Sequence, residues 1–128
     1  MNRKVILVLE DVESRIAWLR EEVRVDNVVW VKSNAEFISF VERSAPEDIS
    51  LMIFDHDLGR DKGIEAARFL SERFNQVPVI VWSMNVSGSI SIVETLKGKG
   101  FVGLHLPFTD GNLEKLKTFV KAWGGSHD

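Results

Sequence analysis

Residues 5–11 read Val-Ile-Leu-Val-Leu-Glu-Asp, an apolar run that ends directly on two carboxylates. The apolar residues are continuous rather than alternating, which is typical of a strand covered on both faces of a sheet. Further short runs rich in Val, Ile and Leu follow, and we predict a strand in each of them: Val28–Val31, Leu51–Phe54, Val77–Trp82 and Phe101–Leu106. The sequence therefore predicts five strands, most of them buried on both faces.

Segments with helical spacing of apolar residues lie between these strands. Two shorter helices are marked by apolar pairs, Phe37 with Val41 and Ile92 with Leu96. Longer stripes step by three or four residues, as on one face of a helix: Val12, Ile16, Leu19 and Val23; Ile64, Ala67, Leu70 and Phe74; Leu113, Leu116, Val120 and Trp123. Strands that alternate with helices predict a three-layer, doubly wound α/β domain, in which helices cover both faces of a parallel sheet.

Composition limits the classes of function that the chain can have. Its 128 residues suit one domain, which we place at residues 1–123, followed by a flexible tail at 124–128. With 16 basic and 19 acidic residues the net charge is −3, which indicates no surface for nucleic acid or a membrane. Without cysteine there is no thiolate nucleophile, and no apolar run approaches the roughly 20 residues of a membrane span. We therefore expect a cytoplasmic protein.

Carboxylates follow two of the predicted strands. Glu10 and Asp11 end the first strand, and Asp55 ends the third. In parallel sheets, ligands bind beyond the carboxyl ends of the strands, where the strand order reverses. If the first and third strands are neighbours, three carboxylates converge there and repel one another unless a cation lies between them. Oxygen ligands of this kind suit Mg²⁺, so the sequence predicts a divalent cation site at this edge.

The polar residues at the strand ends have simpler interpretations when each is taken alone. Asp11 is then the N-cap of the helix that follows, and Ser83 is a turn hydroxyl after the fourth strand. His56 is then a solvated residue of the loop 56–63, in which Asp61 caps the next helix. The alternative for this loop is a phosphate-facing rim, because it also carries two basic residues. The grouping at adjacent strand ends favours the cation site.

This constellation resembles the receiver domains of two-component response regulators, over nearly the whole chain. The acid pair lies in Val-Leu-Glu-Asp, the phosphoacceptor position is Asp55 in Ile-Phe-Asp, and the hydroxyl position is Ser83 in Pro-Val-Ile-Val-Trp-Ser. With the βα repeat, the resemblance implies a flavodoxin-like sheet in the order 2-1-3-4-5. It also implies phosphoryl transfer to Asp55, and Mg²⁺ or Mn²⁺ held by Glu10, Asp11, Asp55 and the backbone carbonyl of Asp57.

The end of the fifth strand departs from the receiver pattern. Receivers have Lys-Pro-Phe where this chain has Leu-Pro-Phe, so Leu106 stands at the lysine position and supplies no charge. Gly103 stands three residues earlier, at the position of the aromatic switch residue. His105, between them, is interpreted as a core or helix-facing residue. Because electrostatic stabilisation of a transition state is typically worth several kcal/mol, we expect phosphorylation of Asp55 to be slow.

Three loop segments resemble a divergent receiver branch proposed to process cyclic phosphates in RNA repair. The segments are Leu-Glu-Asp-Val-Glu-Ser-Arg, Phe-Asp-His-Asp-Leu-Gly and Trp-Ser-Met-Asn-Val-Ser-Gly. The matching residues are Arg15, His56, Asp57, Ser83, Asn85 and Gly88. Trp82 stands where that branch has a histidine. The resemblance implies that Arg15 and Asn85 grip phosphate and that His56 or Asp57 carries the proton.

Two main interpretations of function stay open. The first, which we favour, is a divergent receiver-like module with a regulatory role in a phosphorelay, in which a sensor kinase or a small phosphodonor phosphorylates Asp55. The close alternative is a metal-dependent phosphoesterase that acts on a cyclic phosphate. A third is a receiver relic that serves as an interaction domain. Asp55, Ser83 and His56 are the candidate catalytic residues. The sequence does not decide whether the chain is an enzyme, nor its oligomeric state.

Overall fold

A computed structural model of the 128-residue chain describes residues 4–54, 57–58, 61–83, 86–107 and 109–123. One sheet is five-stranded, and every pair of neighbours in it is parallel. The order across this sheet is β2 (Val28–Val31), β1 (Val5–Leu9), β3 (Ile49–Phe54), β6 (Val79–Trp82) and β7 (Gly103–Leu106). Counted along the chain, these strands follow the predicted order 2-1-3-4-5, and the flavodoxin-like fold is confirmed.

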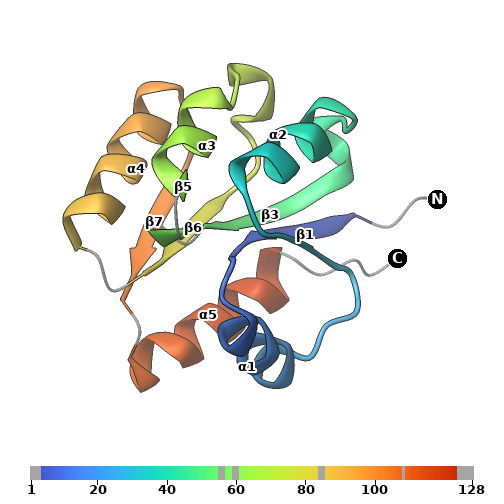
Figure 1. Cartoon of the computed structure of the whole chain (residues 1–128), viewed down its shortest axis with the longest axis vertical. Helices are drawn as coiled ribbons and strands as arrows, with labels where there is room; N and C mark the ends of the chain where they lie inside the picture. Colours follow the sequence, from blue (N-terminus) through green and yellow to red (C-terminus); the bar gives the residue numbers. More distant parts are fainter. Residues whose placement is uncertain (1–3, 55–56, 59–60, 84–85, 108, 124–128) are drawn as a thin grey trace.

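Helices cover both faces of this sheet (Figure 1). One face carries α1 (Glu13–Val23) and α5 (Asp110–Trp123). The other carries the remaining α-helices, which are α2 (Asn34–Glu42), α3 (Gly63–Phe69) and α4 (Val86–Gly98). Successive strand residues point to opposite faces, so each strand needs apolar side chains at every position. This three-layer arrangement explains the continuous apolar runs in the sequence.

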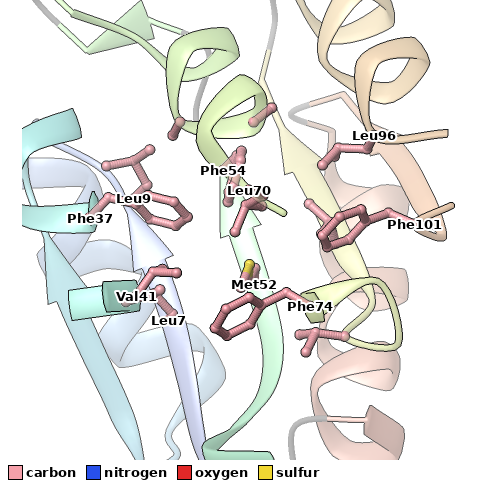
Figure 2. Packing of buried hydrophobic residues seen from close by; sticks show 14 of the residues in the cluster. Leu7, Leu9, Phe37, Val41, Met52, Phe54, Leu70, Phe74, Leu96 and Phe101 are labelled. Carbon is pink, nitrogen blue, oxygen red and sulfur yellow. The ribbon is translucent and has the colours of Figure 1, made fainter. Parts of the chain in front are cut away.

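The α2–α4 core is the buried cluster between the sheet and helices α2, α3 and α4 (Figure 2). Within it, the ring of Phe37 from α2 meets the ring of Phe54 from β3 edge to face, with centroids 5.2 Å apart. Both rings are fully buried. The buried members of this core are Leu7, Leu9, Val31, Phe37, Val41, Ile49, Met52, Phe54, Ala66, Ala67, Leu70, Phe74, Val77, Val79, Val81, Ile92, Leu96 and Phe101.

The α1–α5 core lies on the opposite face of the sheet. Its buried members are Ile6, Val8, Leu19, Leu51, Ile53, Ile80, Trp82, Leu106, Leu113, Leu116 and Val120. Strand residues alternate between the two cores, as Ile6 and Val8 do with Leu7 and Leu9 in β1. A shift of strand register by one residue would exchange these sets between the faces, so the two cores together fix the register.

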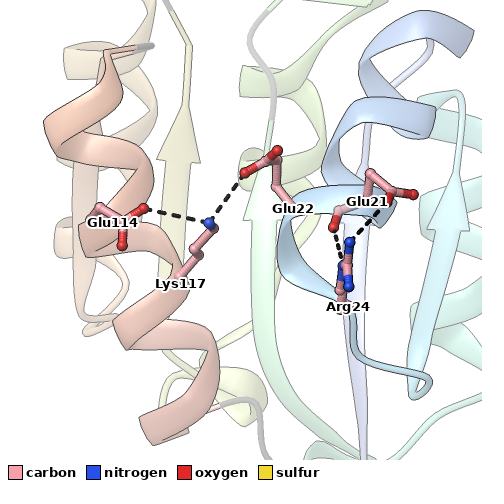
Figure 3. Close-up of polar contacts among 5 residues, drawn as sticks. All are labelled: Glu21, Glu22, Arg24, Glu114 and Lys117. Carbon is pink, nitrogen blue, oxygen red and sulfur yellow. Dashed lines mark hydrogen bonds and ion pairs between the residues drawn. The ribbon is translucent and has the colours of Figure 1, made fainter.

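A polar bridge joins the outer surfaces of α1 and α5 (Figure 3). Lys117 of α5 donates to Glu22 of α1 at 3.1 Å and to Glu114, one turn earlier in α5, at 3.4 Å. The hydrogen bond to Glu22 is the main reason that the pKa of Lys117 is raised above its usual value. At the end of α1, Arg24 adopts a left-handed conformation with φ 52°, and its guanidinium donates a hydrogen bond to the carboxylate of Glu21. Helix α1 is therefore tied to α5 by charge as well as by the core.

Helix α3 is shorter than the apolar stripe predicted. Leu70 follows the end of the helix, and Phe74 lies in a separate 3₁₀ turn at Glu72–Phe74, although both side chains are buried. Lys99 provides a physical reason, because its ammonium group donates to the carbonyl oxygens of Arg68 and Leu70. A side chain from a distant turn thus caps the last carbonyls of α3, in place of a further helical turn.

Other boundaries differ from the prediction by a few residues. Val12 is the N-cap of α1 and is exposed, and Trp123 is exposed at the end of α5, where it stacks on Phe119. Strand β3 begins two residues earlier than predicted, whereas β6 and β7 each begin two residues later. Pro78 lacks an N–H to donate to a neighbouring strand, which explains why β6 begins at Val79.

The loop predicted after β3 contains a small antiparallel pair. Strand β4 (Asp57–Leu58) pairs with β5 (Asp61–Lys62), with Leu58 opposite Asp61. Asp61 lies in β5, two residues before α3 begins at Gly63, and its predicted role as a cap of that helix stays a prediction. In the described part of the chain, no helix combines the length and the apolar character needed to cross a bilayer.

Candidate metal and phosphate site

The carboxyl ends of β1, β3 and β6 meet at one edge of the sheet. Leu9 at the end of β1 lies opposite Phe54 at the end of β3, and Phe54 lies opposite Val81 of β6. The first and third strands are therefore neighbours, which is the condition on which the convergence of carboxylates depends. Glu10 and Ser83 begin the loops that leave β1 and β6 on either side of β3.

Glu10 is a buried carboxylate whose two oxygens both have partners. Its side chain is 2% exposed, and Oε2 accepts the backbone N–H of Val12 at 3.2 Å. Oε1 lies 3.8 Å from Nη1 of Arg15, a half-buried residue in the first turns of α1. A buried charge is stable only when it is paired and hydrogen-bonded, and both conditions are met here. Arg15 therefore brings a cation to the strand end.

Asp11 differs from Glu10 in that one of its oxygens is buried without a partner in the described part of the chain. Its Oδ1 has no hydrogen-bond partner among the residues that the structure describes. The N-cap of α1 is Val12, so the simpler interpretation of Asp11 as the cap was wrong. A buried carboxylate oxygen left unsatisfied costs about 1–3 kcal/mol or more. An unpaired, hard oxygen at a strand end fits a divalent cation, which takes such atoms as ligands.

The first turn of α1, next to the acid pair, is tied to the end of β2. Glu13 accepts a hydrogen bond from Lys32, which follows β2. This hydrogen bond, together with the charge of Lys32, lowers the pKa of Glu13 from its usual value. The contact joins the start of the helix that carries Arg15 to the residue after β2.

Part of the predicted site lies outside the described residues. Asp55, His56 and Asn85 belong to this part, and Asp57 is placed only by its backbone, as the first residue of β4. Within the residues that are described, no group of three or more acidic or histidine side chains is assembled. The structure thus brings together Glu10, the neighbouring Asp11 and Arg15, and it leaves the predicted contributions of the β3 loop untested.

Ser83 and His105 are linked by a contact that the sequence did not predict. Ser83 is buried directly after β6, and its carbonyl oxygen lies 3.1 Å from Nε2 of His105 in β7. A carbonyl only accepts hydrogen bonds, so Nε2 carries the proton and donates it to Ser83. His105 is half-buried. It therefore ties β7 to the backbone of the candidate site, rather than serving only as a core residue.

Comparison with known proteins identifies the family. A family model described as the cyclic-phosphate processing receiver domain matches residues 5–98. The chain belongs to this family. No curated protein matched the sequence of this receiver domain.

Solved structures of receivers share the fold. The phosphorylated cyanobacterial phytochrome response regulator RcpA aligns with a TM-score of 0.74 and 17% identity, over 100% of this chain and 98% of that one. The Mn²⁺-bound response regulator Rcp1 gives 0.68 and 18%, over 93% and 92%. The receiver domain of the sensor histidine kinase PA1611 from Pseudomonas aeruginosa PAO1, with magnesium in its active site cleft, gives 0.66 and 20%, over 98% and 100%. At these identities the similarity shows the fold alone.

Leu106, which the resemblance places at the lysine position of receivers, lies in the apolar interior. Leu106 is 4% exposed and belongs to the α1–α5 core, together with Trp82. Gly103, at the aromatic switch position, is half-buried and faces Val93 and Leu96 of α4. Arg15 of α1 is thus the cation that pairs with Glu10, whereas Leu106 at the end of β7 is part of the apolar core.

Trp82 also makes a contact that the sequence did not predict. Its ring stacks on that of Trp18 in α1, with centroids 6.3 Å apart and planes inclined by 14°. Trp82 is buried, as predicted, whereas Trp18 is 42% exposed. Trp18 lies off the apolar stripe of α1. A large aromatic residue in that position could have indicated from the sequence that it has a role outside the core.

Proposed function

We propose that this receiver domain binds Mg²⁺ or Mn²⁺ at the carboxyl edge of its sheet and uses the cation to process a cyclic phosphate. The observation that carries the proposal is the buried Oδ1 of Asp11, which has no partner among the described residues and lies beside the Glu10–Arg15 pair. The description of the family supports the substrate class. Solved receivers of the same fold that contain Mn²⁺ or Mg²⁺ support the cofactor.

The residues of the chain divide the work in this proposal. Asp11 holds the cation, with Asp55 and the carbonyl of Asp57 as further ligands. When bound, the cation polarises a phosphoryl oxygen or activates a water molecule. Glu10 already contacts the backbone N–H of Val12 and the guanidinium of Arg15. Its main role in this proposal is to position that guanidinium, and not to bind the cation.

Arg15 and the polar loop residues act on the phosphate itself. The guanidinium of Arg15 presents several donors in one plane, which suits two phosphate oxygens at once. Ser83 lies at the end of β6, where its hydroxyl adds a neutral donor. Asn85 supplies a further contact to phosphate, and His56 or Asp57 carries the proton.

A second candidate is a regulatory receiver in which Asp55 is phosphorylated by a sensor kinase or a small phosphodonor. The observation that favours it is the placement of Ser83, a buried residue at the strand end beside β3, as the resemblance to receivers requires. The buried Leu106 counts against rapid phosphorylation, because no lysine at β7 neutralises the phosphoryl group. We therefore rank this function second.

Calorimetry, intact mass and turnover together separate the two functions. The full chain with Mg²⁺ is incubated with a nucleoside 2′,3′-cyclic phosphate and, separately, with a small phosphodonor. We expect hydrolysis of the cyclic ester and little retained phosphoryl mass; stable phosphorylation without hydrolysis would support the regulatory receiver instead. Asp11→Asn should abolish Mg²⁺ binding, whereas Glu94→Gln, an exposed change on α4, should not. Unchanged Mg²⁺ affinity in Asp11→Asn would place the metal elsewhere.

The proton carrier is tested by a separate variant. His56→Ala should abolish turnover and leave Mg²⁺ affinity unchanged, because the imidazole moves a proton and does not hold the metal. If turnover persists with the same pH profile, His56 is not the carrier, and Asp57 or a metal-bound water takes that role.

A further inference from the structure

Trp18 occupies an unusual position beside the candidate site. It is 42% exposed, although its ring stacks almost parallel on the buried ring of Trp82, the residue directly before Ser83. It follows Arg15 by three positions in α1, so the two side chains are neighbours on one face of the helix, with Cβ atoms about 5–6 Å apart. A large aromatic ring thus projects from the same face of α1 as the guanidinium that meets Glu10.

The surroundings of Trp18 favour a small ligand over a protein partner. Protein interfaces are marked by contiguous apolar patches of several hundred Å². On the surface of α1 the residues three and four positions away from Trp18 are all polar: Ser14, Arg15, Glu21 and Glu22. Glu22 is also engaged in the bridge to Lys117 of α5. Among the described residues of α1, the exposed apolar surface on this face is therefore a single ring within a polar frame.

We propose that Trp18 is the platform on which the base of a nucleotide stacks while Arg15 holds its phosphate. This inference rests on the proposed function and narrows its substrate class from cyclic phosphates in general to nucleoside cyclic phosphates. Stacking on Trp82 fixes the plane of the Trp18 ring before the ligand arrives, so little side-chain freedom is lost on binding. Every base has a π face, so the platform accepts different bases.

The expected effect follows from the strength of base stacking. Loss of one aromatic platform corresponds to roughly 5- to 150-fold in affinity. The base belongs either to a free nucleotide or to the 3′-terminal nucleotide of an RNA, and both present the same chemistry to Trp18. The platform is specific to the base, so a cyclic phosphate without a base should not depend on it.

Kinetics of the full chain with Mg²⁺ test the platform. The substrates are adenosine 2′,3′-cyclic phosphate, a short RNA that ends in a 2′,3′-cyclic phosphate, and glycerol cyclic phosphate, which lacks a base. Trp18→Leu should lower kcat/KM for both nucleotides by roughly 5- to 150-fold and leave the glycerol ester unchanged. Trp18→Phe should retain most of the preference. If the wild type has equal kcat/KM for the free nucleotide and the RNA, Trp18 contacts the terminal base alone. If only the RNA substrate depends on Trp18, the natural ligand is the end of an RNA.

A matched control is present in the same chain. Trp123 is 39% exposed and stacks on Phe119, with centroids 4.7 Å apart, but it ends α5, far along the helix from the carboxyl edge of the sheet. Trp123→Leu should therefore leave every substrate unaffected. If Trp18→Leu slows all three substrates equally, Trp18 supports the site structurally and the platform is wrong.

A binding measurement keeps this inference separate from the proposed function. Calorimetry measures the affinity for adenosine 2′-monophosphate and for inorganic phosphate, so it tests stacking on Trp18 even if no ester is hydrolysed. We expect Trp18→Leu to lower the affinity for adenosine 2′-monophosphate and to leave the affinity for inorganic phosphate unchanged. Equal affinity of the wild type and Trp18→Leu for the nucleotide overturns the platform, whatever the turnover shows. Loss of self-association in Trp18→Leu, with nucleotide affinity unchanged, would assign the ring to a protein contact and also overturn it.

Discussion

The α2–α4 core and the α1–α5 core lie on opposite faces of one sheet and are closed in different ways. On the first face, fully buried rings such as Phe37 and Phe54 meet edge to face beneath the helices. On the second face, the buried ring of Trp82 lies under a Trp18 ring that is still partly exposed. The outer surfaces of α1 and α5 are joined by the charges of Glu22 and Lys117.

This difference leads us to expect that substitutions on the two faces have different effects. The α2–α4 core contributes by burial alone, which depends on packing and not on charge. The α1–α5 core contains Leu106 and Trp82, and its helix α1 carries Arg15 to the acid pair. Changes on the first face should therefore alter stability, whereas changes on the second should alter the candidate site as well.

The largest effect on stability is expected on the α2–α4 face. Phe37→Ala should lower the free energy of unfolding by about 3–5 kcal/mol, because the change leaves a cavity in a fully buried cluster. Urea unfolding measures this loss, and calorimetry should show unchanged Mg²⁺ affinity in the folded variant. Phe69→Ala, at an exposed ring on α3, is the control and should cost much less. Equal losses in the two variants would contradict the role given to this core.

The next effect concerns Asp11 and depends on metal. At Mg²⁺ concentrations 100-fold above Kd, the wild type should gain about 2.7 kcal/mol of stability, and Asp11→Asn should gain none. Without metal, Asp11→Asn should be at least as stable as the wild type, because the buried unpaired oxygen no longer belongs to a charged group. Thermal unfolding with and without Mg²⁺ measures both effects. A metal-free variant clearly less stable than the wild type would show that Asp11 has a structural partner.

A smaller loss is expected when a charge enters the α1–α5 face. Leu106→Lys should lower the free energy of unfolding by about 2 kcal/mol, because it places a charged side chain in an apolar cluster. Leu106→Met, which conserves volume, should cost less than about 1.5 kcal/mol. If Asp55 accepts phosphate, Leu106→Lys should also speed its labelling by a small phosphodonor, followed by intact mass. An unchanged rate would count against placing residue 106 near the phosphoryl group.

The smallest effect is expected at the bridge between α1 and α5. The pKa of Lys117 is raised above the usual lysine value of about 10.4, so its ion pairs stabilise the fold below that pH. This contribution is lost as pH rises through the raised pKa of the folded state. The stability difference between the wild type and Lys117→Met should therefore be small at neutral pH and vanish in strong alkali. A difference that persists there would show that the aliphatic stem, not the charge, matters.

Local patterns in the sequence were enough to predict the sheet. Residues in runs such as Val5–Leu9 are apolar at every position because both faces of the sheet are covered, so the pattern indicated buried parallel strands directly. The place of the acid pair also followed from chain geometry, since Glu10 comes directly after the strand. That β1 and β3 are neighbours then confirmed the premise of the cation site, though not the ligation itself.

Contacts between distant residues could not be predicted in the same way. Lys99 lies in a turn about 30 positions after the end of α3 and donates to carbonyl oxygens there. No local sequence pattern predicts such a contact. Likewise His105 reaches the carbonyl of Ser83 only because β7 pairs with β6. The Trp18–Trp82 stack depends on how α1 lies over the sheet, which apolar spacing alone does not define.

The sheet order also has a consequence for synthesis on the ribosome. The adjacent strands β2, β1 and β3 are all present once residue 54 has been made. The apolar residues Ile6 and Val8, however, pack in the same cluster as Leu116 of the last helix. At roughly 5–20 residues per second, the nascent chain leaves the α5 half of that face uncovered for several seconds, with only α1 in place. A chain interrupted before Asp110 lacks α5 permanently and leaves that half of the face exposed, so such a fragment should depend on chaperones to remain in solution.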